Sequence, residues 1–209
     1  MIYTWSNWHK NIRPYAPGAA EPIIDNAILL AAREYFYKTK THKSWLDPIK
    51  SLNPTKIAAE YEFELPEETE VFEISKASIN GEPLAVSALN QLPADPFRST
   101  SSMGMTLIPK DTNAFYLSSA VTKSQNIQVL VLLQPTLTAT GIDADIASQH
   151  YEAIAFGARA NLLELPGFFN PDLSIKNRND FLQAIDQEKI RAWKGNTQFS
   201  TGTNKRMFR

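Results

Sequence analysis

Cysteine is absent from this sequence of 209 residues. Its absence excludes disulfide bonds, thiolate metal sites and cysteine nucleophiles. Long apolar runs are missing too, because no stretch approaches the roughly 20 apolar residues that a membrane-spanning helix needs. Residues 1–5 lack the basic start and the apolar run of a signal peptide. We therefore expect a protein that is made in a reducing cytoplasm and has no membrane partner.

An excess of charge of either sign is also lacking. Lysine and arginine number 21 against 22 aspartates and glutamates, which gives a net charge of -1 and a pI of about 6.3. No global basic field therefore recruits nucleic acid or a membrane surface. With 43% hydrophobic and 21% charged residues, the composition is that of an ordinary globular chain with one sizeable core or two small ones.

Residues that carry chemistry are few. The three histidines, His9, His42 and His150, show no zinc-type spacing, and the phosphate-binding and serine-nucleophile glycine motifs are missing. Asp143 and Asp145 come shortly before His150, but the helix dipole explains acidic residues at the start of a helix. We therefore expect no catalytic residues, no cofactor and no metal, and we predict that the protein is not an enzyme.

A run of glutamates is the remaining candidate for catalysis or cation binding. It comprises Glu62, Glu64, Glu67, Glu68 and Glu70. Such a run is typical of the solvated face of an edge strand, where like charge opposes edge-to-edge aggregation. A hydrolase that uses a pair of these carboxylates is the alternative interpretation.

The segment 148–165 is predicted to be a helix with two distinct faces. Apolar residues recur along one face at helical spacing. Small residues recur along another, at Ala153, Gly157 and Ala160. A neighbouring backbone can come close to this second face because no large side chain holds it off. A Pro-Gly pair at 166–167 ends the helix, and similar spacing predicts helices over 22–40 and 171–194.

Between the first two helices the hydrophobic period changes to that of strands. Residues 57–65 alternate apolar with polar, and Asn80-Gly81 after the strand 71–79 is a strong hairpin signal. Further strands are predicted at 84–89, 103–108, 114–118 and 127–133. We infer an α+β fold: a helical bundle of three main helices with an inserted antiparallel β domain, sandwich-like or barrel-like, and extended N- and C-terminal arms.

Domain bounds follow from these elements. Residues 1–50 and 140–195 are assigned to the helical domain, residues 55–135 to the β domain and residues 196–209 to a flexible C-terminal arm. Residues 1–21 are rich in tryptophan, tyrosine and proline. This mixture suits an extended arm that is held down by its aromatic side chains.

The C-terminal arm is polar and locally basic. Its isolated apolar residues are Phe199, Met207 and Phe208, and its last charges are Lys205, Arg206 and Arg209. Such a segment cannot build a core and is typical of disorder in the free chain with folding on a partner. The partner is either a protein, with Phe208 in an apolar pocket, or the phosphates of DNA, to which binding would be strongly salt-dependent.

Three segments, in order along the chain, resemble motifs of the head-to-tail adaptor proteins of tailed bacteriophages. The first is RPYAPGAAEP at residues 13–22, with the aromatic-ended helix that follows it. The second is VLVLLQP at 129–135, with glutamine in place of the usual lysine. The third is YEAIAFGA at 151–158 with LLELPG at 162–167. The resemblance covers nearly the whole chain, except residues 84–118, where nothing matches.

This resemblance implies a structural virion protein. Relatives form a ring, commonly dodecameric, between the portal protein and the tail or neck, and packaged DNA passes through the ring without sequence-specific binding. Their helical part docks on the portal, and their β part contacts the next neck or tail-tube protein. The portal-docking residues here would be Phe199, Lys205, Arg206, Phe208 and Arg209, and the protein would lie in the neck of the virion after assembly in the host cytoplasm.

One further function of a different class stays open beside the adaptor and the hydrolase. A non-catalytic module would bind a ligand, a peptide or a glycan on the β domain. Ring-shaped particles on mixing with a portal protein would favour the adaptor. Binding of small ligands without any assembly would favour the binding module.

Overall fold

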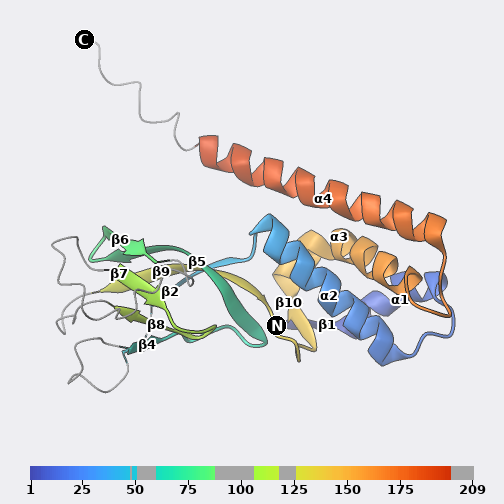
Figure 1. Cartoon of the computed structure of the whole chain (residues 1–209), viewed down its shortest axis with the longest axis horizontal. Coiled ribbons are helices and arrows are strands. Elements are labelled where there is room, and N and C mark those ends of the chain that lie inside the picture. Colours follow the sequence, from blue (N-terminus) through green and yellow to red (C-terminus); the bar gives the residue numbers. More distant parts are fainter. Residues whose placement is uncertain (48, 51–59, 88–105, 118–125, 199–209) are drawn as a thin grey trace, which may run out of the picture. The chain divides into compact units, whose positions relative to one another are not determined.

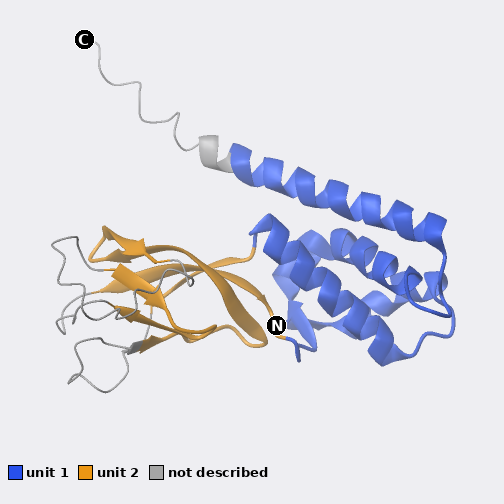
Figure 2. Ribbon diagram, in the orientation of Figure 1, with its two compact units in different colours: residues 1–41, 137–209 blue, residues 42–136 orange. Residues whose placement is uncertain are grey.

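The computed structural model of the chain describes residues 1–47, 49–50, 60–87, 106–117 and 126–198. The chain divides into two compact units (Figure 2). Unit 1 consists of residues 1–41 and 137–209, and unit 2 consists of residues 42–136. Among the described residues, the helices all belong to unit 1, and most of the strands belong to unit 2.

Unit 1 is built on helices (Figure 1). Its α-helices are α1 (His9–Ile12), α2 (Glu21–Thr39), α3 (Ala144–Leu163) and α4 (Pro171–Gln198). Two 3-10 helices, η1 (Trp5–Trp8) and η2 (Arg13–Tyr15), flank α1. The strands β1 (Ile2–Thr4) and β10 (Gly141–Asp143) form a two-stranded antiparallel sheet. These short elements connect the start of the chain to the segment that leads into α3.

The three helices predicted from hydrophobic spacing are confirmed as α2, α3 and α4. Local chemistry sets their ends. Lys40 adopts a left-handed conformation (φ 54°) and caps α2. The Asp143 side chain accepts a hydrogen bond from the backbone N–H of Asp145 (2.9 Å), so α3 begins four residues before the predicted start at residue 148. Asn170 caps α4 in the same way, through the N–H of Leu173 at 3.2 Å.

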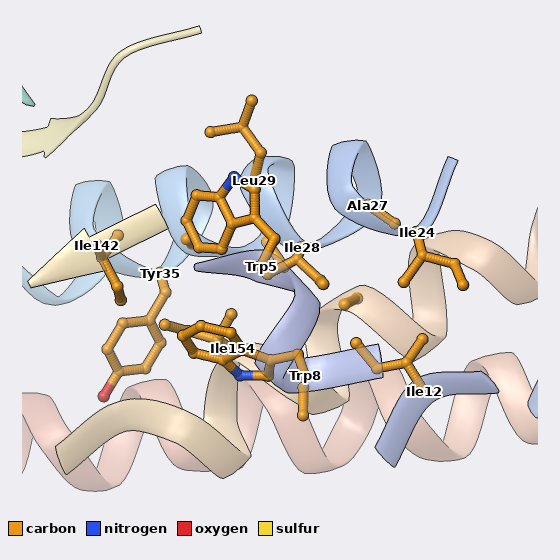
Figure 3. Packing of buried hydrophobic residues seen from close by; sticks show 14 of the residues in the cluster. Trp5, Trp8, Ile12, Ile24, Ala27, Ile28, Leu29, Tyr35, Ile142 and Ile154 are labelled. Atoms are coloured by element: carbon orange, nitrogen blue, oxygen red, sulfur yellow. The ribbon is translucent and has the colours of Figure 1, made fainter. Parts of the chain in front are cut away.

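The N-terminal segment is not the extended arm that its composition predicted. Trp5 and Trp8 are buried in the core of unit 1 (Figure 3). The indole Nε1 of Trp5 donates to the carbonyl of Ala139 at 2.7 Å, and that of Trp8 donates to the carbonyl of Tyr151 at 3.2 Å. The Trp8 ring also stacks on Tyr151, with 5.1 Å between centroids. These contacts order the segment because each buried indole N–H finds a carbonyl partner.

Unit 2 is a single eight-stranded sheet in its described part. Its strands are β2 (Lys43–Leu46), β3 (Ile49–Lys50), β4 (Glu60–Glu62), β5 (Thr69–Ile79), β6 (Glu82–Val86), β7 (Thr106–Pro109), β8 (Ala114–Leu117) and β9 (Ile127–Pro135). Their order in the sheet is β2-β9-β5-β6-β7-β8-β4-β3. All neighbours are antiparallel except β6 and β7, which run parallel. The apolar core of the unit gathers around Phe115, whose ring stacks on Tyr61 at 5.3 Å.

The predicted hairpin at Asn80-Gly81 is confirmed. Both residues have positive φ, 53° and 86°, as the two central residues of a tight turn of this kind require. The turn joins β5 to β6, with Ile79 opposite Glu82. The predicted strand 57–65 is observed only as β4, and its residues 57–59 lie outside the described part.

The predicted fold class is wrong. It combined a bundle of three main helices with an inserted antiparallel β domain, sandwich-like or barrel-like, and extended arms. In the described part, ten strands accompany four α-helices. The eight strands of unit 2 form one mixed sheet, and unit 1 has a two-stranded sheet of its own. The spacing of apolar residues does not reveal that two three-residue strands such as β1 and β10 pair. It also does not show whether strands that are separated in the chain, such as β6 and β7, pair in parallel or antiparallel.

The glutamate run does not mark an edge strand. β4, which carries Glu60 and Glu62, lies between β8 and β3, so β3 and β2 are the outer strands of the described sheet. Glu70, on β5, accepts a hydrogen bond from the Gln134 side chain on β9 at 2.8 Å. These carboxylates are therefore spread over different strands.

Candidate interaction surface

Small residues of α3 lie where three helices meet. Gly157 faces both α2 and α4, because a Cβ added to it would lie 2.9 Å from the Cβ of Ala31 and 2.9 Å from Cε2 of Phe181. Ala160 is buried, and its carbonyl accepts a hydrogen bond from Ser174 on α4 at 3.4 Å. Ala153, the third small residue, is partly buried against the same core.

The predicted portal-docking residues cannot be placed. Phe199, Lys205, Arg206, Phe208 and Arg209 lie outside the described residues. No group of three or more histidine, aspartate or glutamate side chains able to hold a metal ion occurs among residues that the structure describes. Within the same part of the chain, no helix is both long and apolar enough to cross a bilayer.

Two stripes of exposed apolar side chains run along α2 and α4. On α2, Ile23, Leu30 and Tyr37 are exposed at a spacing of seven residues, which keeps them on one side of the helix. On α4 the exposed apolar residues of the stripe are Ile175, Leu182, Ile190 and Trp193. A different side of α4, about 100° around the helix from this stripe, packs on the core through Phe181 and Ile185. Each helix therefore has a buried apolar face and a second, exposed one.

α2 and α4 run in the same direction. α3 is antiparallel to α2, because Asn161 donates to the carbonyl of Ala27 (3.4 Å) while His150 lies 3.0 Å from the Tyr35 hydroxyl. α3 is antiparallel to α4 as well, since Ser174 meets Ala160 and the later Phe181 meets Gly157. The two exposed stripes are thus parallel to one another.

An ion pair joins the centres of the two stripes. Glu34 lies four residues after Leu30 and three before Tyr37, so it belongs to the α2 stripe. Arg178 lies three residues after Ile175 and four before Leu182, so it belongs to the α4 stripe. Their side chains meet at 2.9 Å. We call the combined stripes of Ile23, Leu30, Tyr37, Ile175, Leu182, Ile190 and Trp193 the α2–α4 apolar surface.

The charge of Glu34 is stabilised at this position. Partial burial alone would raise the pKa of its carboxyl group, but hydrogen bonds from Lys38 (2.6 Å) and Arg178 outweigh it, and the pKa lies below its usual value of 4.5. The ion pair therefore persists at all but acidic pH. It holds the middle of the surface in one geometry and leaves the apolar side chains around it exposed.

A buried polar pair lies between α2 and α3. The Tyr35 hydroxyl and His150 Nδ1 are 3.0 Å apart, and both residues are buried. Burial lowers the pKa of His150, an effect that Glu188 opposes and Arg191 reinforces. Burial also raises the pKa of Tyr35 well above its usual value of 10.0. Both groups are therefore neutral at neutral pH, which suits a structural hydrogen bond inside an apolar core.

Sequence reasoning missed the α2–α4 apolar surface, although part of its signal was present. Ile23, Leu30 and Tyr37 repeat at seven residues, but the same helix also carries a buried apolar stripe that accounts for a globular core. Only the packed structure distinguishes the two. Exposed apolar patches on a protein surface mark sites of interaction with other proteins or membranes more often than single exposed residues do.

Comparison with known proteins adds no family to this description. No protein-family model matches the sequence, and no curated protein matches it.

Proposed function

We propose that this protein is a structural component of a tailed-phage virion, a head-to-tail adaptor that forms a ring between the portal and the next neck or tail-tube protein. Its copies would assemble, commonly as a dodecamer, around a conduit for packaged DNA. The observation that carries the proposal is the α2–α4 apolar surface, an exposed apolar face on the helical unit. The ordered adaptor-like motifs of the sequence support the same role.

The motif residues also have a structural role that fits the proposal. The RPYAPG segment forms η2 and the turn before α2. The guanidinium of Arg159, on the adaptor-like helix α3, lies 4.6 Å from the centroid of the Tyr15 ring, and its Nε donates to the carbonyl of Asn11 at 3.1 Å. Tyr15 of the first resembling segment thus contacts α3, the helix that contains most of the third.

The partner that we assign to the α2–α4 apolar surface is the portal protein. Interfaces derive most of their affinity from a few residues near their centre that become fully desolvated on docking. Leu182 lies next to Arg178 on the exposed stripe, so we expect it to be one of them. A glutamate at this position would lose its water on docking and could pair with Arg178 only in competition with Glu34, so its burial is costly.

The experiment compares Leu182→Glu with Leu173→Glu, both on α4. The two leucines are almost equally exposed, 39% and 38%, and lie nine residues apart, about 180° around the helix. We expect Leu182→Glu to weaken binding to the portal protein encoded with this chain by about tenfold or more, equivalent to about 1.4 kcal/mol. Leu173→Glu should bind as the wild type does.

Affinity and ring formation are measured together, by calorimetry and by negative-stain imaging of the mixtures. Melting temperatures of both variants control for folding. Equal portal binding by all three proteins would remove the assigned role of the surface. Absence of any ring on the portal, even with the wild-type protein, would remove the adaptor function itself.

A further inference from the structure

Unit 2 contains a surface hollow that the proposed adaptor role does not use. Its volume is about 470 Å³, within the range typical of sites for small ligands. The residues that give it chemical character are Trp45, Ser75, Lys76, Ser78 and Pro83. They come from β2, β5 and the start of β6, three strands of one sheet.

Strand pairing places an aromatic ring and a cation on the same face of this sheet. Trp45 on β2 is directly opposite Leu130 on β9, and Leu130 is directly opposite Lys76 on β5. Residues that pair directly across strands project from the same side of a sheet. Trp45 and Lys76 therefore flank Leu130, with their Cα atoms about 10 Å apart, since adjacent strands are about 4.8 Å apart.

The Trp45 side chain is exposed, with 57% of the residue accessible. Trp5 and Trp8, in the core of unit 1, are buried, and Trp193 on the α4 stripe is exposed as well. An indole face carries negative electrostatic potential and attracts C–H bonds that point at it from the face of a saturated ring. Exposure of such a large apolar ring next to a hollow indicates a stacking platform.

The polar groups around the platform select the ligand. Lys76 is the one charged side chain among the described residues that line the hollow, so the site favours an anion. Ser75 and Ser78 supply hydroxyl groups that both donate and accept hydrogen bonds. Leu132, two residues after Leu130 on β9, pairs with Lys43 on β2 and with Glu73 on β5. These two side chains form the neighbouring row across the sheet, and they carry opposite charges.

We propose that this hollow binds an acidic saccharide. The sugar ring stacks on Trp45, its carboxylate pairs with the Lys76 ammonium group, and its hydroxyls bond to Ser75 and Ser78. A single lysine matches the one negative charge of a uronic acid better than the several charges of a nucleotide phosphate, for which proteins use arginine forks, backbone nests or helix N-termini. The site is independent of the α2–α4 apolar surface and of the proposed function.

The test uses the full chain and trigalacturonate as the probe, with the neutral sugar galactotriose and with ATP as comparison ligands. Binding is followed by calorimetry and by saturation-transfer NMR. We expect trigalacturonate to bind with a Kd in the millimolar range or tighter, as befits a shallow site, and both comparison ligands to bind at least about tenfold more weakly.

Three variants locate the site. Trp45→Ala and Lys76→Met should each weaken trigalacturonate binding by about tenfold or more. Lys43→Met is the matched control, because it removes one lysine from the adjoining row of the same sheet, and it should bind as the wild type does. All three positions are exposed, so the melting temperatures should stay unchanged.

Four results would overturn the proposal. The first is no binding of trigalacturonate at high millimolar concentration. The second is binding of ATP as tightly as, or more tightly than, the acidic sugar, which would make the hollow a nucleotide site. The third is binding of galactotriose as tightly as trigalacturonate, which would remove the role of Lys76. The fourth is an equal loss of affinity in Lys43→Met and Lys76→Met, which would indicate unspecific attraction by lysine.

Discussion

At the scale of single residues, Gly157 fixes how closely the helices of unit 1 pack. The space beyond its Cα is filled by Ala31 and by the Phe181 ring, both close to where a Cβ would lie. A larger residue has to push α2 or α4 away. The free energy of unfolding therefore depends on the absence of a side chain at this position.

We predict that Gly157→Leu lowers the free energy of unfolding by roughly 1–3 kcal/mol or more, because the added side chain overpacks the core. The measurement is urea unfolding followed by circular dichroism. Gly157→Ala should cost less, since alanine favours helix by about 1 kcal/mol relative to glycine. In the Phe181→Leu background, where the ring no longer fills this space, adding Gly157→Ala should cost less free energy of unfolding than it does in the wild type. An unchanged unfolding midpoint in Gly157→Leu would instead mean that α3 presents this face to solvent.

His150 is the residue whose titration should be visible in the stability of the protein. Burial lowers its folded-state pKa below the usual 6.5, so the unfolded chain takes up a proton at a higher pH than the folded one does. Stability from this group is complete above about pH 6.5 and is lost as pH falls below that value. When His150 Nδ1 accepts the hydrogen bond from the Tyr35 hydroxyl, protonation of this nitrogen breaks the bond, so the bond also favours the neutral imidazole.

We predict that the wild-type protein loses more stability between about pH 7.5 and about pH 5.5 than His150→Gln does. Glutamine keeps a hydrogen-bonding group near Tyr35 but does not titrate. His9 and His42 are present in both proteins, so the difference between the two pH profiles reports His150. Chemical unfolding at several pH values provides the measurement, and parallel profiles would contradict the prediction.

At the scale of elements, the β5–β6 hairpin depends on the conformation of its turn. Gly81 has φ of 86°, and nothing lies within 4 Å of the position that a Cβ would occupy. The cost of a side chain there is therefore backbone strain and not a clash. Asn80, with φ of 53°, accepts a hydrogen bond from the N–H of Asn126 at 2.8 Å and so also attaches the turn to the segment before β9.

We predict that Gly81→Ala destabilises unit 2 by roughly 1–2 kcal/mol, the usual cost of a left-handed conformation for a residue with a Cβ. Gly18→Ala is the matched control, because Gly18 has nearly the same φ of 85° and equally open surroundings but lies in unit 1. It should destabilise unit 1 by a similar amount and leave unit 2 unchanged. Hydrogen exchange assigns each loss to its unit. If Gly81→Ala left the exchange rates of β5 and β6 unchanged, the turn would not constrain the hairpin.

At the scale of the whole molecule, the cores of both units are built from residues well before the C-terminus. All buried apolar residues in the described part precede residue 186. Residues 199–209 contain the predicted docking residues Phe199, Lys205, Arg206, Phe208 and Arg209. Folding and portal attachment should therefore be separable by truncation.

We predict that deletion of residues 199–209 leaves the melting temperature unchanged and abolishes attachment to portals. The α2–α4 apolar surface stays intact in this variant, so comparison with Leu182→Glu shows whether portal docking needs one site or both. Attachment in low and high salt distinguishes a protein partner from DNA phosphates. Truncated protein that still attached, and still gave DNA-retaining particles, would remove both roles of the segment.

Local elements could be predicted from the order of residues alone. Helical spacing located α2, α3 and α4, and Asn80-Gly81 located the hairpin, because these depend on side-chain period and on backbone conformations that neighbouring residues fix. The small residues of α3 similarly indicated a close helix contact. Each of these features is encoded within a short stretch of chain.

How the elements combine depends on contacts between distant parts of the chain. The pairing of β1 with β10, the parallel pair β6–β7 and the interior position of β4 join segments far apart in the chain, so no local pattern encodes them. The two candidate sites arise in the same way. Trp45 and Lys76 lie on the same face of the sheet, on either side of β9, and the Glu34–Arg178 ion pair joins the stripes that contain Leu30 and Leu182. Whether an apolar side chain is buried or exposed depends on what packs against it, and that is a property of the whole fold.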